Sequence, residues 1–315
     1  MIQKSRMLPL RLGVHVSING GIEKAVVRAR ELGCTAMQIF SRNPRGWEAS
    51  PLSSRSIRSF REALIPGDLD PIVVHTPYMI NLATPDERLY RRSITVLTAE
   101  LQRAAQIGAR YVVTHLGSAR EKSKAYGQER AVKALRVSLS QPAPVSLLLE
   151  NSAGAGQGIG GRLEELQAII KGVGESERLG VCFDTCHAYA AGYDFGTRGK
   201  TDILAGELSR TIGRKRLLLL HLNDCAGRLG AHLDRHEHIG AGKIGLSGFR
   251  ALLGHPAFQG IPMILETPKE TPGDDLKNLL RIRKICQTLK VSSYCRSCKS
   301  SSLPRKRESG ENAAS

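Results

Sequence analysis

The segment LLLLHLND, from Leu217 to Asp224, joins a run of four leucines to a histidine, an asparagine and an aspartate at its C-terminal end. Seven more short apolar runs occur along the chain: LGVHVS (12–17), AMQIF (36–40), PIVVHT (71–76), YVVTHLG (111–117), VSLLLEN (145–151), LGVCFDTCH (179–187) and PMILET (262–267). Each run has the length and composition of one β-strand. Eight strands is the number that closes a β/α barrel.

Longer amphipathic segments separate these runs. Apolar residues recur at spacings of three and four from Gly21 to Leu32, from Asp86 to Ile107 and from Arg162 to Val173, a pattern typical of helices with one buried face. Alternating strands and helices predict a parallel sheet. We therefore predict an α/β fold, a single parallel (β/α)8 TIM barrel, over residues 1–290. A doubly wound open sheet gives the same alternation and stays open as the alternative.

The C-terminal residues differ in composition from the rest of the chain. From about Val291 the apolar periodicity stops, and a Ser-rich, Lys/Arg-rich sequence with few large apolar residues follows. Such a segment lacks the apolar surface needed to form a core, so we predict that residues 291–315 are a basic, disordered tail. Its CxxC pair, Cys295 and Cys298, could form half a zinc site, but no second Cys or His pair follows it.

The composition favours a basic protein with an aliphatic core. Aromatic residues make up only 4% of the chain, so Leu, Ile, Val and Ala must fill the interior, as they do in barrels. The formal net charge is +17, which attracts polyanions, and nucleic acid is the leading candidate partner. Solvated basic helix faces without a polyanionic partner are the alternative explanation of that charge.

Cysteine usage and hydropathy suggest a compartment. Seven cysteines show no regular disulfide framework, and no apolar leader with a cleavage site precedes the first predicted strand. No apolar run approaches the roughly 20 residues that cross a bilayer. We expect a reduced, cytoplasmic protein that does not associate with membranes.

The chemically informative residues lie near the C-terminal ends of the predicted strands. Six successive strands, the third to the eighth, each carry one residue of a type that binds metals: His75, His115, Glu150, Asp184, His221 and Glu266. A buried carboxylate beside a run such as LLLE is costly unless a metal or a cationic partner compensates its charge. Because the C-terminal ends of parallel barrel strands open onto one face, these residues should converge there and bind zinc or manganese.

Three further candidate ligands are predicted in loops. His187 follows Asp184 by three residues, and Asp234 and His236 belong to a DRH sequence after the seventh strand. A single zinc takes three or four protein ligands, so nine candidates imply roughly two or three ions. Clustered divalent ions suit phosphoryl transfer, and with the basic charge they indicate a phosphodiesterase.

Several motifs resemble the endonuclease IV family. They are GVHVSINGGIEKA, QIFSRNPRGW, HTPYMINLA, LLENSAGAGQGIGG, GVCFDTCHAYAAGYD, HLNDCAGRLGAHLDRHEHIGAGKIG and ILETP, and the similarity extends from about Leu10 to Leu289. The FDTCH, HLND, DRH and ILET elements occur in order and keep every residue of ligand type. The chain is therefore identified as a member of this family, on a xylose-isomerase-like barrel.

The resemblance implies the site and the reaction in detail. It implies three zinc ions per chain, with manganese as an alternative at one site, held by three groups: His75, His115 and Glu150; Glu150, Asp184, His221 and Glu266; and His187, Asp234 and His236. It implies that Glu150 and Glu266 are catalytic, and that Arg45, Tyr78 and Met79 contact DNA. The activity implied is hydrolysis of the phosphodiester 5′ to abasic sites in double-stranded DNA, leaving a 3′-hydroxyl and a 5′-deoxyribose phosphate. Removal of blocked 3′ ends and a monomeric state are also implied.

A metal-dependent sugar isomerase or epimerase is the main alternative. Such enzymes also gather Glu, Asp and His at the strand ends of the same barrel, and a fold alone does not decide function. The additional ligands His75, His115 and His187, the DRH triplet and the basic charge favour the nuclease. His15, at the end of the first strand, we interpret as a neighbour of the ligands.

Overall fold

The computed structural model describes residues 10–174 and 176–299, except for the side chains of 290–299. Eight parallel strands form one sheet, in the order β1-β10-β7-β6-β5-β4-β3-β2. They are β1 (Leu12–Val14), β2 (Met37–Phe40), β3 (Ile72–His75), β4 (Tyr111–Thr114), β5 (Ser146–Glu150), β6 (Leu179–Asp184), β7 (Leu217–His221) and β10 (Met263–Leu265). All eight predicted strands are present, each shorter than its apolar run.

Contact between the two edge strands decides between a barrel and an open sheet. His15, just after β1, forms a parallel bridge with Gln38 of β2. The amide N–H of Val16 donates to the carbonyl of Gln38 at 2.7 Å. The two ends of the sheet, β1 and β2, therefore meet and close it into the predicted TIM barrel. The alternative of a doubly wound open sheet is wrong.

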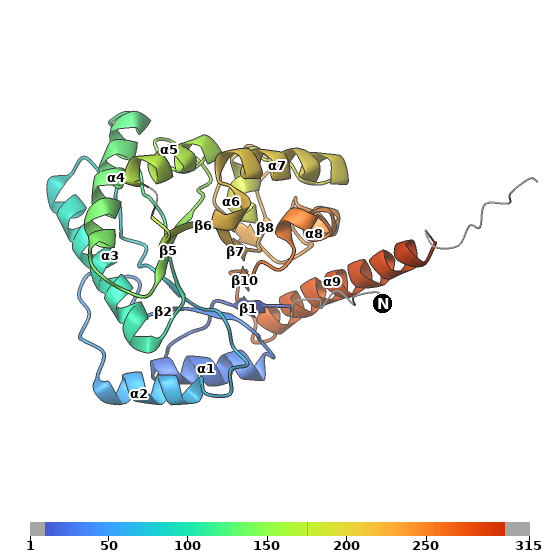
Figure 1. Cartoon of the computed structure of the whole chain (residues 1–315), viewed down its shortest axis with the longest axis horizontal. Coiled ribbons are helices and arrows are strands. Elements are labelled where there is room, and N and C mark those ends of the chain that lie inside the picture. The colour runs from blue at the N-terminus through green and yellow to red at the C-terminus, as the bar shows by residue number, and fades with distance from the viewer. Residues whose placement is uncertain (1–9, 175, 300–315) are drawn as a thin grey trace, which may run out of the picture.

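Helices cover the outside of the barrel (Figure 1). They are α1 (Ile22–Glu31), α2 (Ser54–Ala63), α3 (Glu87–Ile107), α4 (Lys124–Ser140), α5 (Leu163–Val173), α6 (Thr185–Ala190), α7 (Arg198–Thr211), α8 (Gly245–Leu253) and α9 (Asp274–Lys299). The three predicted helices correspond to α1, α3 and α5. The side chain of Asp86 caps α3 by accepting from the amide of Leu89. A two-stranded antiparallel sheet, β8 (Asp224–Cys225) and β9 (His236–Glu237), follows β7.

Two groups of buried apolar side chains form the core. The larger group lies between the sheet and the helices. The smaller group takes one residue from almost every strand or its flank: Ala36, Val73, Val113, Leu148, Cys182, Leu219 and Ile264. Side chains alternate between the two faces of a strand. A residue two positions after a member of the smaller group therefore points into the barrel, on the same face as that member.

Helix α9 extends into the segment predicted as a tail. Its backbone is helical to Lys299, so it passes the boundary predicted at residue 290 and includes the positions of Cys295 and Cys298. In Figure 1 its C-terminal part projects away from the barrel. The remaining part of the predicted tail, 300–315, and the side chains of the CxxC pair lie outside the described residues. Among the described residues, no helix combines the length and apolar character needed to span a bilayer.

Candidate metal centre

The six strand-end residues predicted as ligands form one layer of the barrel. His75, Glu150, Asp184 and His221 are the last residues of β3, β5, β6 and β7, and His115 and Glu266 directly follow β4 and β10. Each lies two positions after a member of the smaller core group, for example His75 after Val73 and Glu266 after Ile264. The same alternation that buries the apolar side chains therefore brings these polar side chains together at the C-terminal end of the barrel.

Glu150 lies at the centre of this layer and is 1% exposed. Its two carboxylate oxygens contact four imidazole rings: His75 at 3.1 Å, His115 at 3.4 Å, His187 at 3.4 Å and His221 at 2.9 Å. Burial alone would raise the pKa of Glu150, but the nearby His115 and His221 outweigh it and hold that pKa well below its usual range. Glu150 is therefore an anion that several groups of ligands can share.

A second group surrounds the ring of His221. Its Nδ1 lies 3.1 Å from Oε2 of Glu266 and 4.0 Å from Oδ2 of Asp184. One potential ligand atom from each of Glu150, Asp184, His221 and Glu266 lies within 4.8 Å of all the others. The side chain of Glu266 is 18% exposed, whereas those of Glu150, Asp184 and His221 are fully buried. Glu266 is therefore at the side of this group that opens to solvent.

The third group joins α6 to the loop between β8 and β9. Asp184 caps α6, and its Oδ1 accepts from the amide of His187 at 2.7 Å. Nε2 of His187 lies 3.0 Å from Oδ1 of Asp234 and 3.4 Å from Nε2 of His236. Burial opposes protonation of His187, but the charge of Asp184 and the contact with Asp234 raise its pKa well above the usual value. Cys186 lies close enough to Asp184 and His236 to form a further, overlapping group.

The hydrogen bonds of the imidazole rings fit metal binding. Nδ1 of His75 donates to the carbonyl of Thr76 at 2.7 Å, and Nδ1 of His236 donates to the carbonyl of Glu266 at 3.0 Å. Each ring therefore directs its Nε2 at the carboxylates, and this nitrogen can ligate a metal once it is deprotonated, which is how metal-ligating histidines are held. Nitrogen and carboxylate donors in groups of three and four suit zinc or manganese. The donor set is chemically consistent with the predicted ions.

Three amide side chains support the ligands and were missed by the sequence analysis. Oδ1 of Asn151 accepts from the amide of Asp184 at 2.7 Å. Nδ2 of Asn223 donates to Oδ2 of Asp184 at 2.6 Å, and its Oδ1 accepts from the amide of Glu266 at 2.8 Å. Gln38, in β2, contacts Glu266 and His221. The sequence signal for the asparagines is their position: Asn151 directly follows Glu150, and Asn223 lies two residues after His221.

The predicted DNA-contacting residues lie in loops at the same end of the barrel. Arg45, in the loop after β2, is exposed. Tyr78, three residues after His75, is 65% exposed. The centroid of its ring lies 5.2 Å from that of Phe40, and the centroid of the Phe40 ring lies 5.7 Å from that of His75. Met79 is half-buried. The structure thus places Tyr78 one aromatic ring away from the candidate ligands, and its contact with DNA stays a prediction.

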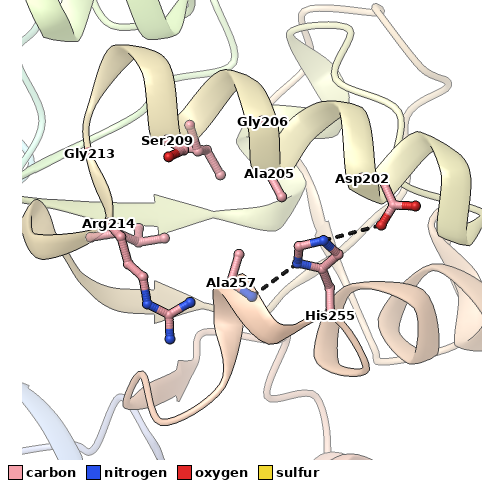
Figure 2. Close-up of a pocket in the computed structure, with 10 residues that line it drawn as sticks. Asp202, Ala205, Gly206, Ser209, Gly213, Arg214, His255 and Ala257 are labelled. Carbon is pink, nitrogen blue, oxygen red and sulfur yellow. Dashed lines mark hydrogen bonds and ion pairs between the residues drawn. The ribbon is translucent and has the colours of Figure 1, made fainter.

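A separate cavity of about 400 Å³ lies on the outside of the barrel, between α7 and the residues preceding β10 (Figure 2). Nε2 of His255 lies 3.2 Å from Oδ1 of Asp202 at one side of it, and Arg214 also lines it. Arg214 donates to the carbonyl of Pro256, so at least one of its N–H groups is already bonded within the protein. None of the nine candidate ligands lines this cavity.

Comparison with known proteins identifies the class and then the family. A family model described as a xylose isomerase-like TIM barrel matches residues 26–286. The D-tagatose 3-epimerase-like protein of known structure shares this fold, with a TM-score of 0.67 and 19% identity, over 90% of this chain and 99% of that chain. At that identity the similarity extends to the fold alone.

More similar relatives share one name. A probable endonuclease 4 from Methanoculleus marisnigri is 45% identical over 87% of this chain and 98% of its own length. A probable endonuclease 4 from Halothermothrix orenii is 42% identical over 86% of this chain and 99% of its own length. The crystal structure of endonuclease IV from Thermus thermophilus superimposes with a TM-score of 0.77 at 39% identity, over 88% of this chain and 99% of that chain. The chain belongs to the endonuclease IV family.

Proposed function

We propose that this protein is a zinc-dependent DNA-repair endonuclease that hydrolyses the phosphodiester 5′ to an abasic site. The products would be a 3′-hydroxyl and a 5′-deoxyribose phosphate, and blocked 3′ ends would be further substrates. The observation that carries the proposal is the convergence of nine ligand-type residues into three groups around Glu150. The names of the relatives, endonuclease 4 and endonuclease IV, support the nuclease activity.

The three groups would hold three zinc ions, with manganese as an alternative in one of them. When bound, such ions supply Lewis acidity toward phosphate oxygens and toward the attacking water. Glu150 would serve two groups at once, since its Oε2 faces His75 and His115 while its Oε1 faces His187 and His221. Its complete burial keeps those contacts free of competing water.

Glu266 would act on the side of the site that opens to solvent. Its Oε2 faces His221, whereas its Oε1 is held by Gln38 and contacts His15. A carboxylate fixed at one oxygen in this way keeps a constant direction, which lets it orient the water that attacks the phosphorus. Glu150 and Glu266 are therefore the catalytic residues that we propose.

The loops would select the damaged nucleotide. An abasic nucleotide lacks both stacking and base pairing, so it costs the least free energy to swing out of a duplex. The exposed ring of Tyr78, together with Met79 and Arg45, would fill the gap that the missing base leaves in the duplex. The net charge of +17 would speed the encounter with DNA, and a single chain is sufficient to hold all nine ligands.

Incision of a defined duplex tests this proposal. Zinc-loaded protein is incubated with a duplex that carries one tetrahydrofuran abasic analogue, and the products are sized on a sequencing gel. We expect incision directly 5′ to the analogue. Glu266→Gln should lower the rate at least about 100-fold, because loss of a ligand costs more than the 10- to 100-fold typical of its hydrogen-bond partners.

The matched control is Glu129→Gln, which changes an exposed glutamate of α4 and should leave the rate unchanged. Intact DNA in the presence of fully zinc-loaded protein would refute the proposal. Epimerisation of a ketose by that same preparation would instead support the sugar-isomerase alternative.

A further inference from the structure

Gln38 is an amide buried inside the barrel, in the same layer as the candidate ligands. It lies on β2, two positions after Ala36 of the smaller core group, and is 0% exposed. Its Nε2 is 2.5 Å from Oε1 of Glu266 and 2.9 Å from Nδ1 of His15. Its Oε1 is 2.9 Å from Nε2 of His221. One side chain therefore joins β2 to the last residue of β7 and to residues that follow β1 and β10.

The orientation of the Gln38 amide follows from the chemistry of its neighbours. An ionised carboxylate can only accept hydrogen bonds, so the group that faces Glu266 at 2.5 Å must be the NH2 of Gln38. The amide oxygen then faces His221, and a flipped amide would place two acceptors against each other. The Nε2 of His221 must therefore carry a proton, which it donates to Gln38.

This hydrogen bond determines which nitrogen of His221 faces the other ligands. With its proton on Nε2, a neutral His221 presents the lone pair of Nδ1. Nδ1 is the atom that lies 2.9 Å from Glu150 and 3.1 Å from Glu266. The thiol of Cys182 also contacts this ring, but sulfur is a weak acceptor and cannot replace the amide oxygen.

His221 uses its two ring nitrogens in the opposite way to His75 and His236. His75 and His236 direct Nε2 at the ligand groups and satisfy Nδ1 with a backbone carbonyl. In His221 the outer nitrogen is Nε2, and its acceptor is a side chain from a strand 183 residues away in sequence. The ring therefore depends on a side-chain acceptor that point mutation can remove.

We propose that Gln38 is a positioning residue of the metal centre. It holds His221 in the tautomer that binds through Nδ1, and it fixes Oε1 of Glu266 with the opposite end of the same amide. The inference rests on the metal centre of the proposed function, and concerns the group formed by Glu150, Asp184, His221 and Glu266. Among the described residues, the side-chain amide of Gln38 hydrogen-bonds to His15, His221 and Glu266, none of which belongs to the other two groups, so those groups should keep their ions.

Two substitutions separate the two halves of this role. Gln38→Met keeps the length of the side chain and removes its hydrogen bonds to His221, Glu266 and His15. Gln38→Glu keeps an acceptor for His221 but replaces the NH2 group with a carboxylate oxygen, which removes the hydrogen bonds to Glu266 and His15. The matched control is Gln167→Met, on α5, where the amide donates to the backbone carbonyl of Thr211 away from the site.

The first measurement is zinc affinity, by competition with a chromophoric chelator, on the full-length chain. We expect one of the bound zinc ions to be held 10- to 100-fold more weakly in Gln38→Met, the range for losing the hydrogen-bond partner of a ligand. Gln167→Met should match the wild type. Equal zinc affinities in Gln38→Met and the wild type would overturn the proposal.

The second measurement is the tautomer of His221, from the ring ¹⁵N shifts and the ring N–H signals of zinc-loaded protein. We expect metal-bound Nδ1 and a slowly exchanging Nε2–H in the wild type and in Gln38→Glu, and rapid exchange of that proton in Gln38→Met. Binding through Nε2 in the wild type would overturn the inference. Neither readout uses DNA, so a zinc-binding wild type that leaves abasic DNA intact would refute the proposed activity and leave the role of Gln38 standing.

Discussion

Glu100→Ala tests a buried ion cluster that supports the loop carrying Arg45. Glu100, on α3, is 0% exposed and accepts a hydrogen bond from Ser41 Oγ at 2.6 Å. The guanidinium groups of Arg42 and Arg103 lie 3.8 and 3.9 Å from its Oε1. Burial raises the pKa of Glu100, against the opposing hydrogen bond of Ser41 and the two positive charges. The carboxylate is thus the common counter-charge of two guanidinium groups.

Both arginines bind the backbone of the loop from residue 41 to residue 50. Arg42 donates to the carbonyls of Gly46 and Trp47. Arg103 donates to the carbonyl of Ser41 and, at 2.8 Å, to that of Ser50. Loss of the counter-charge should therefore loosen this loop as well as destabilise the fold.

The size of the effect follows from the burial of the arginines. Their side chains are 5% and 12% exposed, so Glu100→Ala leaves two poorly hydrated charges without their anion. Breaking a buried ion pair by removing one partner costs about 3–5 kcal/mol. The control on the same helix is Glu87→Ala, because the side chain of Glu87 is 54% exposed and its ion pairs with Arg91 and Arg130 should contribute little.

Urea unfolding followed by circular dichroism measures both free energies of unfolding. We expect a loss of about 3–5 kcal/mol for Glu100→Ala and a much smaller one for Glu87→Ala. The double variant Arg42→Met, Glu100→Met should regain part of the loss, since apolar side chains of similar volume often replace a buried ion pair without cost. Equal losses at the buried and the exposed glutamate would refute the reasoning.

Three further predictions concern the barrel, a helix terminus and DNA contact. Gly13→Ala should prevent folding, because a Cβ at that position would overlap the backbone carbonyl of Ala36, just before β2. Gly206→Ala, with open space around it in α7, should stabilise the fold by about 0.5–1 kcal/mol. Yields of folded protein and urea unfolding measure both effects. Hydrogen bonds from Thr271 lower the pKa of Asp274 below its ordinary 3.8, so its contribution to stability should be full above that pH and lost as the pH falls further. The free energy of unfolding of Asp274→Asn should therefore differ from that of the wild type at pH 6 and converge with it in acid. A difference that stays constant with pH would contradict this. Tyr78→Ala should weaken binding to abasic DNA by about 1–3 kcal/mol, the usual contribution of aromatic stacking on a base, and leave the free energy of unfolding unchanged. Tyr78→Phe, which keeps the ring, is the control. Equal DNA affinities of the two variants would contradict a stacking role.

The fold could be predicted because its hydrophobic pattern has one simple period. Strands buried on both faces appear as continuous apolar runs, and the amphipathic segments between them match α1, α3 and α5. The predicted runs end later than the strands, because the quoted segments include His115 and Glu266, which follow the last paired residues of β4 and β10. Closure of the barrel depends on the contact between His15 and Gln38, which no local pattern encodes.

The candidate site was predictable where a charged residue interrupts an apolar run. Glu150 and Asp184 stand out in this way, because their burial requires compensation. Gln38 did not stand out, since one neutral amide within AMQIF could equally face solvent. Its role depends on the register of β2 against β1, which only the folded structure provides.

The end of the barrel domain was the least predictable feature. The sequence after Val291 lacks the apolar spacing of an amphipathic helix and therefore predicts a basic, disordered tail there. The backbone of α9 nevertheless continues to Lys299. A helix that has already begun adds each further residue at low cost, so its end is weakly determined by local apolar content.

We propose that nine residues, with Glu150 at their centre, hold three zinc ions. Native mass spectrometry of zinc-loaded protein tests it directly, with Glu150→Gln as the variant and Glu129→Gln as the exposed control. We expect three zinc ions per chain in the wild type and in the control, and fewer in Glu150→Gln, because that carboxylate contacts histidines of all three groups. A wild-type chain that binds one zinc ion or none, or a Glu150→Gln variant that keeps all three, would contradict it.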